Sequence, residues 1–219
     1  MSIVSLSQVP PLASIVGDAS PGAPRVPRIP PGVPHRDSAV GRTLGGAVLR
    51  LLGWRVLGNI PDLPKMILAV APHTSNWDFV VGFSAYLALD FTANWFGKHT
   101  IFVGPFGALF RHFGGIPIRR ETSAASQVVD QYAEAFASRR QLVLALAPEG
   151  TRKKVAEWKS GFYRIAVRAQ VPIVPVGFDF RRRCILIGTP FQPSGDWDAE
   201  KGGIRALYAG VAARHPEQA

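Results

Sequence analysis

The sequence predicts an α/β fold: a single domain with a largely parallel, mixed sheet flanked by helices, preceded by a disordered N-terminal tail. Short apolar runs alternate with longer segments of helical periodicity after Pro64, which is typical of a sheet covered by helices. Apolar residues make up 47% of the 219 residues, enough to form a core and to exclude global disorder. Eight of the 19 prolines fall within residues 1–38, so we predict a disordered tail over 1–38 and a domain over 39–219.

The first segment after the tail, residues 39–58, is apolar with arginines interspersed. It is predicted either as a helix packed on the core or as a helix lying in a membrane interface, with Trp54 and the arginines at headgroup level. From Pro64 onward the pattern predicts a strand, a helix that is apolar nearly all round, and two short strands: Met66–Ala71, Asn76–Leu89, Thr100–Val103 and Ile116–Arg119.

The second half of the chain continues the alternation. An amphipathic helix is predicted over Ser123–Ala137, because apolar residues recur on one stripe at Val128, Val129, Tyr132 and Phe136. The run LVLALA at Leu142–Ala147 predicts a buried strand. The remaining predicted elements are a helix, two strands and a closing helix: Lys159–Ala169, Val171–Phe180, Cys184–Ile187 and Asp198–Arg214.

The chain is basic and poor in cysteine. It carries 25 Lys and Arg against 15 Asp and Glu, a formal net charge of +10, although only 18% of its residues are charged. Such a chain attracts anionic partners, and membrane headgroups, nucleic acid and acidic carrier molecules all qualify. The single cysteine, Cys184, excludes an intrachain disulfide framework and a cysteine-based zinc cage.

No segment of the sequence is predicted to cross a membrane. A spanning helix needs about 18 or more consecutive apolar residues. The longest candidates, Phe79–Leu89 and Ile101–Phe110, are shorter and are closed by charged residues. The N-terminus lacks a basic region followed by an apolar stretch, so a signal peptide is not predicted either.

The first candidate site is the sequence HTSNWD at His73–Asp78, directly after the predicted strand Met66–Ala71. Loops that follow buried strands of α/β sheets are where ligands usually bind. On one regular helix the spacing would place His73 and Asp78 about 140° apart. They face each other only if His73 lies in a turn and Asp78 in the first helical turn, with Ser75 or Asn76 as the cap.

In that arrangement Asp78 accepts a hydrogen bond from one imidazole nitrogen of His73. This bond fixes the tautomer, supports positive charge on the ring, and leaves the other nitrogen free as a general base. The alternative interpretation is a capping aspartate beside a structural histidine.

The second candidate site, PEGTRKK at Pro148–Lys154, also follows a predicted buried strand. Gly150 lets the backbone approach a ligand closely, and Arg152 with the following lysines suits a phosphate. Glu149 is predicted to orient Arg152 or to bind a substrate hydroxyl. The alternative is a solvated turn with surface charges.

Two further blocks carry weaker signals. GGIPIRR at Gly114–Arg120 places two arginines at a strand end, where they could reach a phosphate, although paired arginines usually coat a surface. VPIVPV at Val171–Val176 is apolar and carries no chemistry. It is predicted as core in preference to the wall of a pocket for a hydrocarbon chain.

Together, the four blocks resemble those of the glycerolipid acyltransferase family, typified by 1-acylglycerol-3-phosphate acyltransferases. That family carries an H-x4-D block, a G-x-x-x-x-R block, a P-E-G-T-R block and an apolar V-P-I-x-P-V block, in that order. This chain has HTSNWD, GIPIRR, PEGTR and VPIVPV, beginning at His73, Gly115, Pro148 and Val171. The resemblance covers roughly residues 54–190, so the domain over 39–219 is interpreted as an acyltransferase domain.

The resemblance implies transfer of an acyl chain from a thioester to a hydroxyl, usually that of a lysophospholipid. His73 would be the general base and Asp78 would orient and charge-balance it, with no acyl-enzyme, metal ion or cofactor required. The implied substrate-binding residues belong to the second and third blocks. Two of them hold the acceptor phosphate and the others shape the same site: Arg119 and Arg152, with Glu149, Gly150 and Thr151.

The resemblance also implies partners and a location. The donor is acyl-CoA or acyl carrier protein, the acceptor is a lysophospholipid, and no nucleic acid takes part. We expect a peripheral or monotopic protein on the cytoplasmic face of the inner membrane. The sequence leaves open whether the acceptor is 1-acylglycerol-3-phosphate, another lysophospholipid or a lyso-aminolipid.

Three alternatives from other classes remain. A hydrolase would use His73 to activate water on an acyl thioester. A non-catalytic relative would bind lipid without using His73. A nucleic-acid-binding protein would fit the pI near 10.5, but the basic clusters are scattered and no nucleic-acid-binding motif is present in the sequence.

Overall fold

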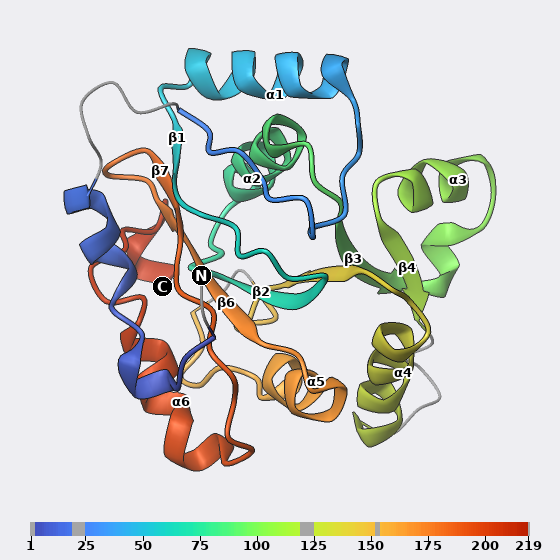
Figure 1. Cartoon of the computed structure of the whole chain (residues 1–219), viewed down its shortest axis with the longest axis vertical. Coiled ribbons are helices and arrows are strands. Elements are labelled where there is room, and N and C mark those ends of the chain that lie inside the picture. Colours follow the sequence, from blue (N-terminus) through green and yellow to red (C-terminus); the bar gives the residue numbers. More distant parts are fainter. Residues whose placement is uncertain (1–2, 19–24, 119–124, 152–153, 219) are drawn as a thin grey trace.

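A seven-stranded sheet with the order β1-β7-β6-β2-β5-β3-β4 forms the centre of the structure (Figure 1). The computed structural model describes residues 3–18, 25–118, 125–151 and 154–218. Neighbouring strands are parallel except for β6 and β7, which are antiparallel. The strands are β1 (Arg55–Gly58), β2 (Lys65–Ala71), β3 (Ala93–Lys98), β4 (Gly115–Ile118), β5 (Leu142–Leu146), β6 (Ile173–Asp179) and β7 (Cys184–Ile187). The predicted α/β fold with a largely parallel, mixed sheet is confirmed.

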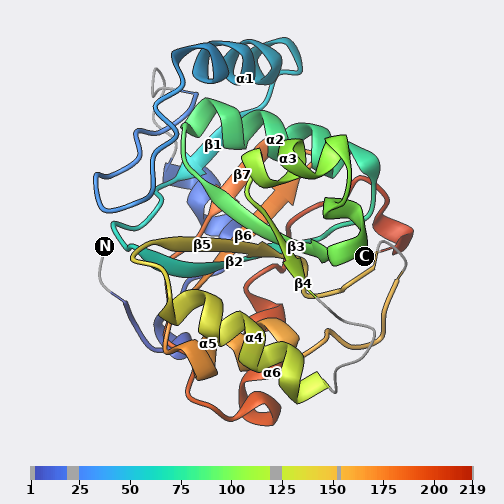
Figure 2. The same ribbon diagram turned by 90° about the vertical axis from the view of Figure 1, so that its right-hand side faces the viewer.

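Helices cover both faces of this sheet (Figure 2). On one side lie α1 (Ala39–Leu51), α2 (Asn76–Leu89) and α3 (Pro105–His112), and on the other α4 (Ala125–Ala137), α5 (Gly161–Ala169) and α6 (Trp197–Ala206). Short 3-10 helices occur at η1 (Leu6–Gln8), η2 (Leu12–Asp18), η3 (His99–Phe102) and η4 (Pro216–Gln218).

The side chains of β2 enter the two cores alternately. Met66 and Leu68 pack in the core beneath α1 and α2. Ile67 and Ala69 pack in the core beneath α4, α5 and α6. Successive side chains of a strand point to opposite faces, so a strand covered on both faces is apolar throughout, which is the pattern of this run.

The carboxyl ends of three strands meet at one edge of the sheet. β2 lies between β5 and β6, with Ala69 opposite Leu146 and Ala71 opposite Gly177. Since the three strands are parallel, the loops that follow them leave from the same edge. The loop after β2 carries the HTSNWD block, the loop after β5 carries the PEGTR block, and the loop after β6 is the turn that leads to β7.

The described parts of the N-terminal segment differ from the predicted disordered tail, because residues 3–18 and 25–38 pack on the domain. Leu12 and Val33 are completely buried, and Leu12 N donates to Leu207 O at 2.8 Å. The prolines prevent regular helices and strands here, yet the apolar residues between them anchor the segment. Burial of such side chains stabilises the folded state by about 1.5–3 kcal/mol each, and this offsets the loss of conformational entropy when the segment becomes ordered.

The region between α2 and β4 also differs from the prediction. The strand predicted at Thr100–Val103 is absent there, and the chain instead forms β3 at Ala93–Lys98 followed by η3. Two polar groups of β3 bind the chain before β4: Asn94 Nδ2 donates to Gly114 O at 3.1 Å, and Trp95 Nε1 donates to Phe113 O at 3.0 Å. Side-chain contacts between distant residues therefore select this strand, and the local apolar pattern does not reveal them.

Two predicted helices are shorter in the structure. Residues 39–58 form α1 only as far as Leu51, and Arg55–Gly58 form β1 beside β7. Gly53, with φ +74°, ends the helix in a left-handed conformation that favours glycine. The closing helix predicted at Asp198–Arg214 ends at Ala206, and Gly210 has φ +79° within the irregular segment that follows.

Among the described residues, no helix combines the length and the apolar content needed to cross a bilayer.

Candidate active site

The loop between β2 and α2 is held by a helix-capping arrangement. Ser75 is the N-cap of α2, and its Oγ accepts from Trp77 N at 3.0 Å. Oδ2 of Asp78, in the first helical turn, accepts from the backbone nitrogens of Thr74 and Ser75, both at 2.7 Å. Because the first amides of a helix lack partners within the helix, such bonds fix the backbone of the loop.

The same carboxylate faces His73. Nδ1 of His73 lies 3.1 Å from Oδ2 of Asp78, and the His73 side chain is 27% exposed whereas that of Asp78 is 0% exposed. A hydrogen bond from Nδ1–H to this carboxylate selects the tautomer in which Nε2 carries no proton. The structure places His73 in the loop before the helix, Asp78 in the first helical turn and Ser75 as the cap, so the two side chains face each other as predicted.

Glu149 approaches His73 from the end of the neighbouring strand, β5. Its Oε2 accepts from His73 N at 2.9 Å, and the residue is buried. Burial raises the pKa of Glu149, while the hydrogen bond from His73 N and the nearby imidazole oppose that rise. The sequence predicts that Glu149 orients Arg152 or binds a substrate hydroxyl, and Arg152 lies outside the described residues. Among the described residues, Glu149 contacts the backbone of the candidate base.

The rest of the PEGTR block forms a tight turn at the same edge of the sheet. Gly150 has φ +63°, and its N donates to Ala147 O at 3.1 Å. Thr151 is partly buried next to it. Arg119 and Arg152, the predicted phosphate ligands, lie outside the described residues. The structure thus brings together the β2 and β5 loops, as the sequence predicts.

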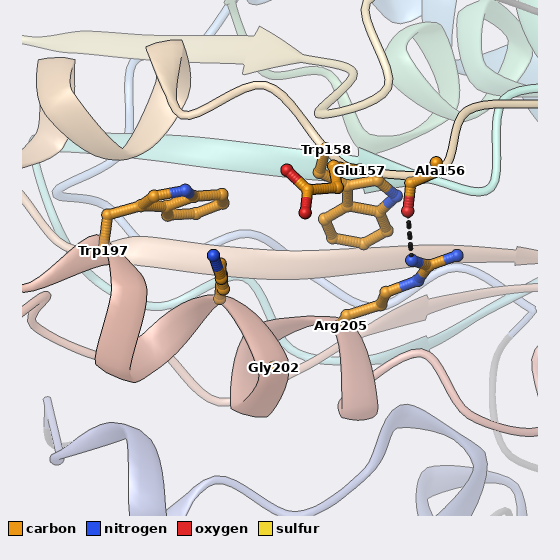
Figure 3. Close-up of a pocket in the computed structure, with 7 residues that line it drawn as sticks. Ala156, Glu157, Trp158, Trp197, Gly202 and Arg205 are labelled. Atoms are coloured by element: carbon orange, nitrogen blue, oxygen red, sulfur yellow. Dashed lines mark hydrogen bonds between the residues drawn. The ribbon is translucent and has the colours of Figure 1, made fainter.

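A shallow cavity of about 180 Å³ lies between α6 and the loop that continues from the PEGTR turn (Figure 3). Arg205 Nη1 donates to Ala156 O at 2.8 Å, and the positive charge of Arg205 opposes the rise that burial causes in the pKa of Glu149. The cavity is lined by two indole rings and by charges of both signs: Ala156, Glu157, Trp158, Trp197, Lys201, Gly202 and Arg205. The sequence did not predict this cavity.

Residues near the C-terminus also reach the site, and sequence reasoning missed them. Tyr208 Oη donates to Ala69 O in β2 at 2.5 Å, and His215 N donates to Thr74 Oγ1 at 3.3 Å. Both residues lie more than 130 positions after their partners in the sequence. The sequence predicted a closing helix over Asp198–Arg214, which includes Tyr208 and ends one residue before His215, and no sequence signal pointed to these contacts.

The VPIVPV block and Cys184 belong to the hydrophobic core. Within the VPIVPV block, Ile173, Val174 and Val176 are buried, which agrees with the prediction of core. Cys184 is buried as well, and burial raises the pKa of its thiol to about 11. A thiol with this pKa is protonated at neutral pH and is a poor nucleophile. In the described part of the chain, no group of three or more His, Cys, Asp or Glu side chains is placed to hold a metal ion.

Comparison with known proteins identifies sequence relatives. The chain is 30% identical over 138 residues to the 1-acyl-sn-glycerol-3-phosphate acyltransferase of Haemophilus influenzae. This aligned region covers 60% of this chain and 56% of that protein. It is 37% identical over 84 residues to the human 1-acyl-sn-glycerol-3-phosphate acyltransferase beta, covering 36% of this chain and 30% of that protein. The chain thus spans about half of the bacterial relative's length and less of the human one.

The fold is similar to that of a solved acyltransferase. The crystal structure of the 1-acyl-sn-glycerophosphate (LPA) acyltransferase PlsC from Thermotoga maritima matches with a TM-score of 0.51 and 21% sequence identity, over 76% of this chain and 73% of that chain. In sequence, the model of the acyltransferase family matches residues 56–179, which include the HTSNWD and PEGTR blocks. Since this match covers more than half of the 219 residues, the chain belongs to the acyltransferase family.

Proposed function

We propose that this protein transfers a fatty acyl chain from a thioester to the hydroxyl of a lysophospholipid such as 1-acylglycerol-3-phosphate, with His73 as the general base. The observation that carries the proposal is the 3.1 Å contact between His73 Nδ1 and Asp78 Oδ2. It directs the unprotonated Nε2 of a partly exposed imidazole toward substrate. The sequence relatives named 1-acyl-sn-glycerol-3-phosphate acyltransferases support the substrate class.

The proposed reaction is a direct attack on the thioester. Nε2 of His73 takes the proton of the acceptor hydroxyl while the hydroxyl oxygen forms a bond to the carbonyl carbon. The carbon–sulfur bond then breaks, and the leaving thiolate takes the proton from the imidazolium. The buried carboxylate of Asp78 stabilises the imidazolium while the proton is held. General-base catalysis of this kind accelerates a reaction by about 10²–10⁴-fold, and alignment of the substrates supplies further acceleration.

The proposed substrate contacts follow from the motif blocks. Arg119 and Arg152 bind the acceptor phosphate, because guanidinium groups form paired hydrogen bonds with phosphate oxygens. Gly150 and Thr151 shape the turn beside them. Glu149 positions the backbone of His73 by accepting a hydrogen bond from its N–H at 2.9 Å. The proposed donor is the thioester of acyl-CoA or of acyl carrier protein.

We also infer that the protein binds peripherally to a membrane, at the cytoplasmic face of the inner membrane. An apolar stripe runs along the exposed face of α1, where Leu51 is 86% exposed. Further exposed apolar side chains lie in the first turns of α2, beside HTSNWD, where Phe79 is 66% exposed. Buried in the headgroup region, such side chains hold an interfacial helix on a bilayer. The stripe consists of Val40, Leu44, Val48 and Leu51.

The test is acyl transfer from labelled acyl-CoA and acyl carrier protein to a panel of lysophospholipids and lyso-aminolipids. Wild type is compared with His73→Ala, and with His112→Ala as a control at an exposed histidine of α3. We expect a diacyl product from wild type and the control, and a loss of about 10²–10⁴-fold in His73→Ala with its thermal transition unchanged. Equal transfer by His73→Ala would exclude this mechanism. Release of free fatty acid without any acceptor would identify a hydrolase instead.

A further inference from the structure

The segment after α6 runs across the sheet edge that carries the candidate active site. Phe180 N, after β6, donates to Ala212 O at 2.8 Å. Arg182 Nη1 donates to Gly210 O at 3.0 Å. The segment then reaches the HTSNWD loop, where His215 N donates to Thr74 Oγ1 at 3.3 Å. It is therefore tied both to the loop after β6 and to the loop after β2.

These bonds bring the backbone next to Arg214 to the loop that carries the candidate base. Arg214 immediately precedes His215, whose partner Thr74 is the neighbour of His73 in the chain. The backbone N of Thr74 binds the same Asp78 oxygen that faces the His73 ring. Arg214 is thus only one residue away from a direct contact with the catalytic loop.

The guanidinium of Arg214 is oriented by two aromatic rings. Its Cζ lies 6.0 Å from the ring centroid of Trp77 and 6.0 Å from that of Phe180. Such distances are at the outer limit of cation–π attraction. The residue is exposed, and it forms no ion pair with the described residues. The acid of the same segment, Glu217, is paired with His215 Nδ1 at 3.3 Å.

We propose that Arg214 is a third phosphate-binding residue of the acceptor site, and this rests on the proposed function. An oriented guanidinium without a carboxylate partner retains all of its donors for an anion, and a planar fork suits phosphate oxygens. The acceptor carries its phosphate a few bonds from the reacting hydroxyl, so the phosphate must lie near the His73 loop. Arg214 lies outside residues 56–179 matched by the family and therefore adds a contact from this chain's own C-terminal segment.

The experiment compares two acceptors that differ only in the phosphate: 1-acylglycerol-3-phosphate and 1-acylglycerol. Variants Arg214→Ala and Arg214→Lys are measured beside Arg164→Ala, which removes the same charge from an exposed position on α5. We expect Arg214→Ala to lower kcat/KM for the phosphorylated acceptor about tenfold or more, mainly through KM. The value for 1-acylglycerol stays the same, Arg214→Lys recovers part of the loss, and Arg164→Ala has no effect.

Three results would overturn the assignment. The first is an equal loss with both acceptors, which indicates a structural role. The second is an equal loss in Arg164→Ala, which indicates general attraction by net charge. The third is weaker binding of Arg214→Ala to phosphatidylglycerol vesicles with an unchanged ratio between the two acceptors, which assigns Arg214 to bilayer headgroups.

A binding measurement separates this proposal from the proposed function. Calorimetric titration with sn-glycerol 3-phosphate, with glycerol as the control, requires no acyl transfer. If wild type transfers no acyl chain, the proposed function fails. Weaker binding of glycerol 3-phosphate by Arg214→Ala still supports the phosphate site, and equal binding by wild type and Arg214→Ala overturns it.

Discussion

The Oδ2 atom of Asp78 lies 3.1 Å from His73 Nδ1 and also accepts the backbone N–H groups of Thr74 and Ser75 at 2.7 Å. One buried oxygen thus caps α2 and orients the imidazole. A change in the helix start would move the carboxylate away from His73, so the fold of the loop and the chemistry of the site depend on the same group. The capping contacts and the contact with His73 are both made by one side chain.

Asp78→Asn separates these two tasks. The amide oxygen of asparagine can take the place of Oδ2 and accept the same three donors, but it carries no negative charge. We therefore expect the thermal transition to change little, while acyl transfer falls by about 10²-fold or more because the imidazolium loses its counter-charge. Enzyme kinetics and circular dichroism melts measure both quantities. Retained activity would show that the carboxylate has only a capping role.

Glu149 offers a test of backbone positioning. Glutamine in its place keeps an acceptor for His73 N, whereas alanine leaves this N–H without a partner in a buried site. We expect Glu149→Gln to keep most of kcat, and Glu149→Ala to lose about tenfold or more, because an unpaired buried donor costs about 1–3 kcal/mol and lets the loop shift. Equal losses in the two variants would instead assign the charge of Glu149 to substrate binding.

The raised pKa of Glu149 predicts how stability depends on pH. Burial favours the protonated form in the folded state, so this group's contribution to stability is fully present below the ordinary glutamate pKa of about 4.3. It is lost as the pH rises from there through the raised folded-state pKa. Glutamine does not titrate, so the stability of Glu149→Gln relative to wild type should increase over the same window. Urea unfolding at several pH values measures the difference, and a difference that falls with rising pH would contradict the prediction.

Local patterns predicted most of the fold. Asn76–Leu89 and Cys184–Ile187 have the predicted bounds, because a capping serine and an apolar run fix them locally. The ordered N-terminal segment was not predicted, since prolines suggest disorder whereas single anchors such as Leu12 decide the outcome. The strand β3 was not predicted either, because its polar residues bind the distant chain at Phe113 and Gly114.

The candidate site was predictable where its residues are close in sequence. His73 and Asp78 share one loop, and a cap between them is the only geometry that lets them meet. The contact of Glu149 with His73 N depends on β5 lying next to β2, which the strand order decides. The contact of His215 with Thr74 depends on the path of the chain after α6. Such tertiary contacts leave no periodic signal in the sequence.

Tyr208 supports β2, the strand that precedes the HTSNWD loop. Its buried hydroxyl donates to Ala69 O at 2.5 Å, and burial raises its pKa, so the hydroxyl keeps its proton at any working pH. Tyr208→Phe should therefore lower the free energy of unfolding by about 1 kcal/mol, the net value of one such bond. Urea denaturation with an unchanged m-value measures this loss. Unchanged stability would show that the bond contributes nothing to β2.

The apolar stripe of α1 can be tested apart from catalysis. The helix is fixed to α2 on its other side, where a Cβ atom on Gly45 would lie 2.4 Å from Ser84 O. This close approach leaves Leu51 facing outward, so Leu51→Asp should not disturb the core. If α1 lies in the headgroup region, the substitution removes one buried leucine, worth about 1.5–3 kcal/mol, and vesicle binding should fall about tenfold or more.

Val167→Asp is the matched control for that experiment. It makes the same change of net charge on α5, which lies on the opposite face of the sheet (Figure 2). Flotation with vesicles of phosphatidylcholine and phosphatidylglycerol compares the two variants with wild type. A loss confined to Leu51→Asp identifies α1 as the membrane-facing element, because both variants have the same net charge. An equal loss in Val167→Asp would show that net charge alone draws the protein to the bilayer, and would contradict the inference that α1 contacts the membrane.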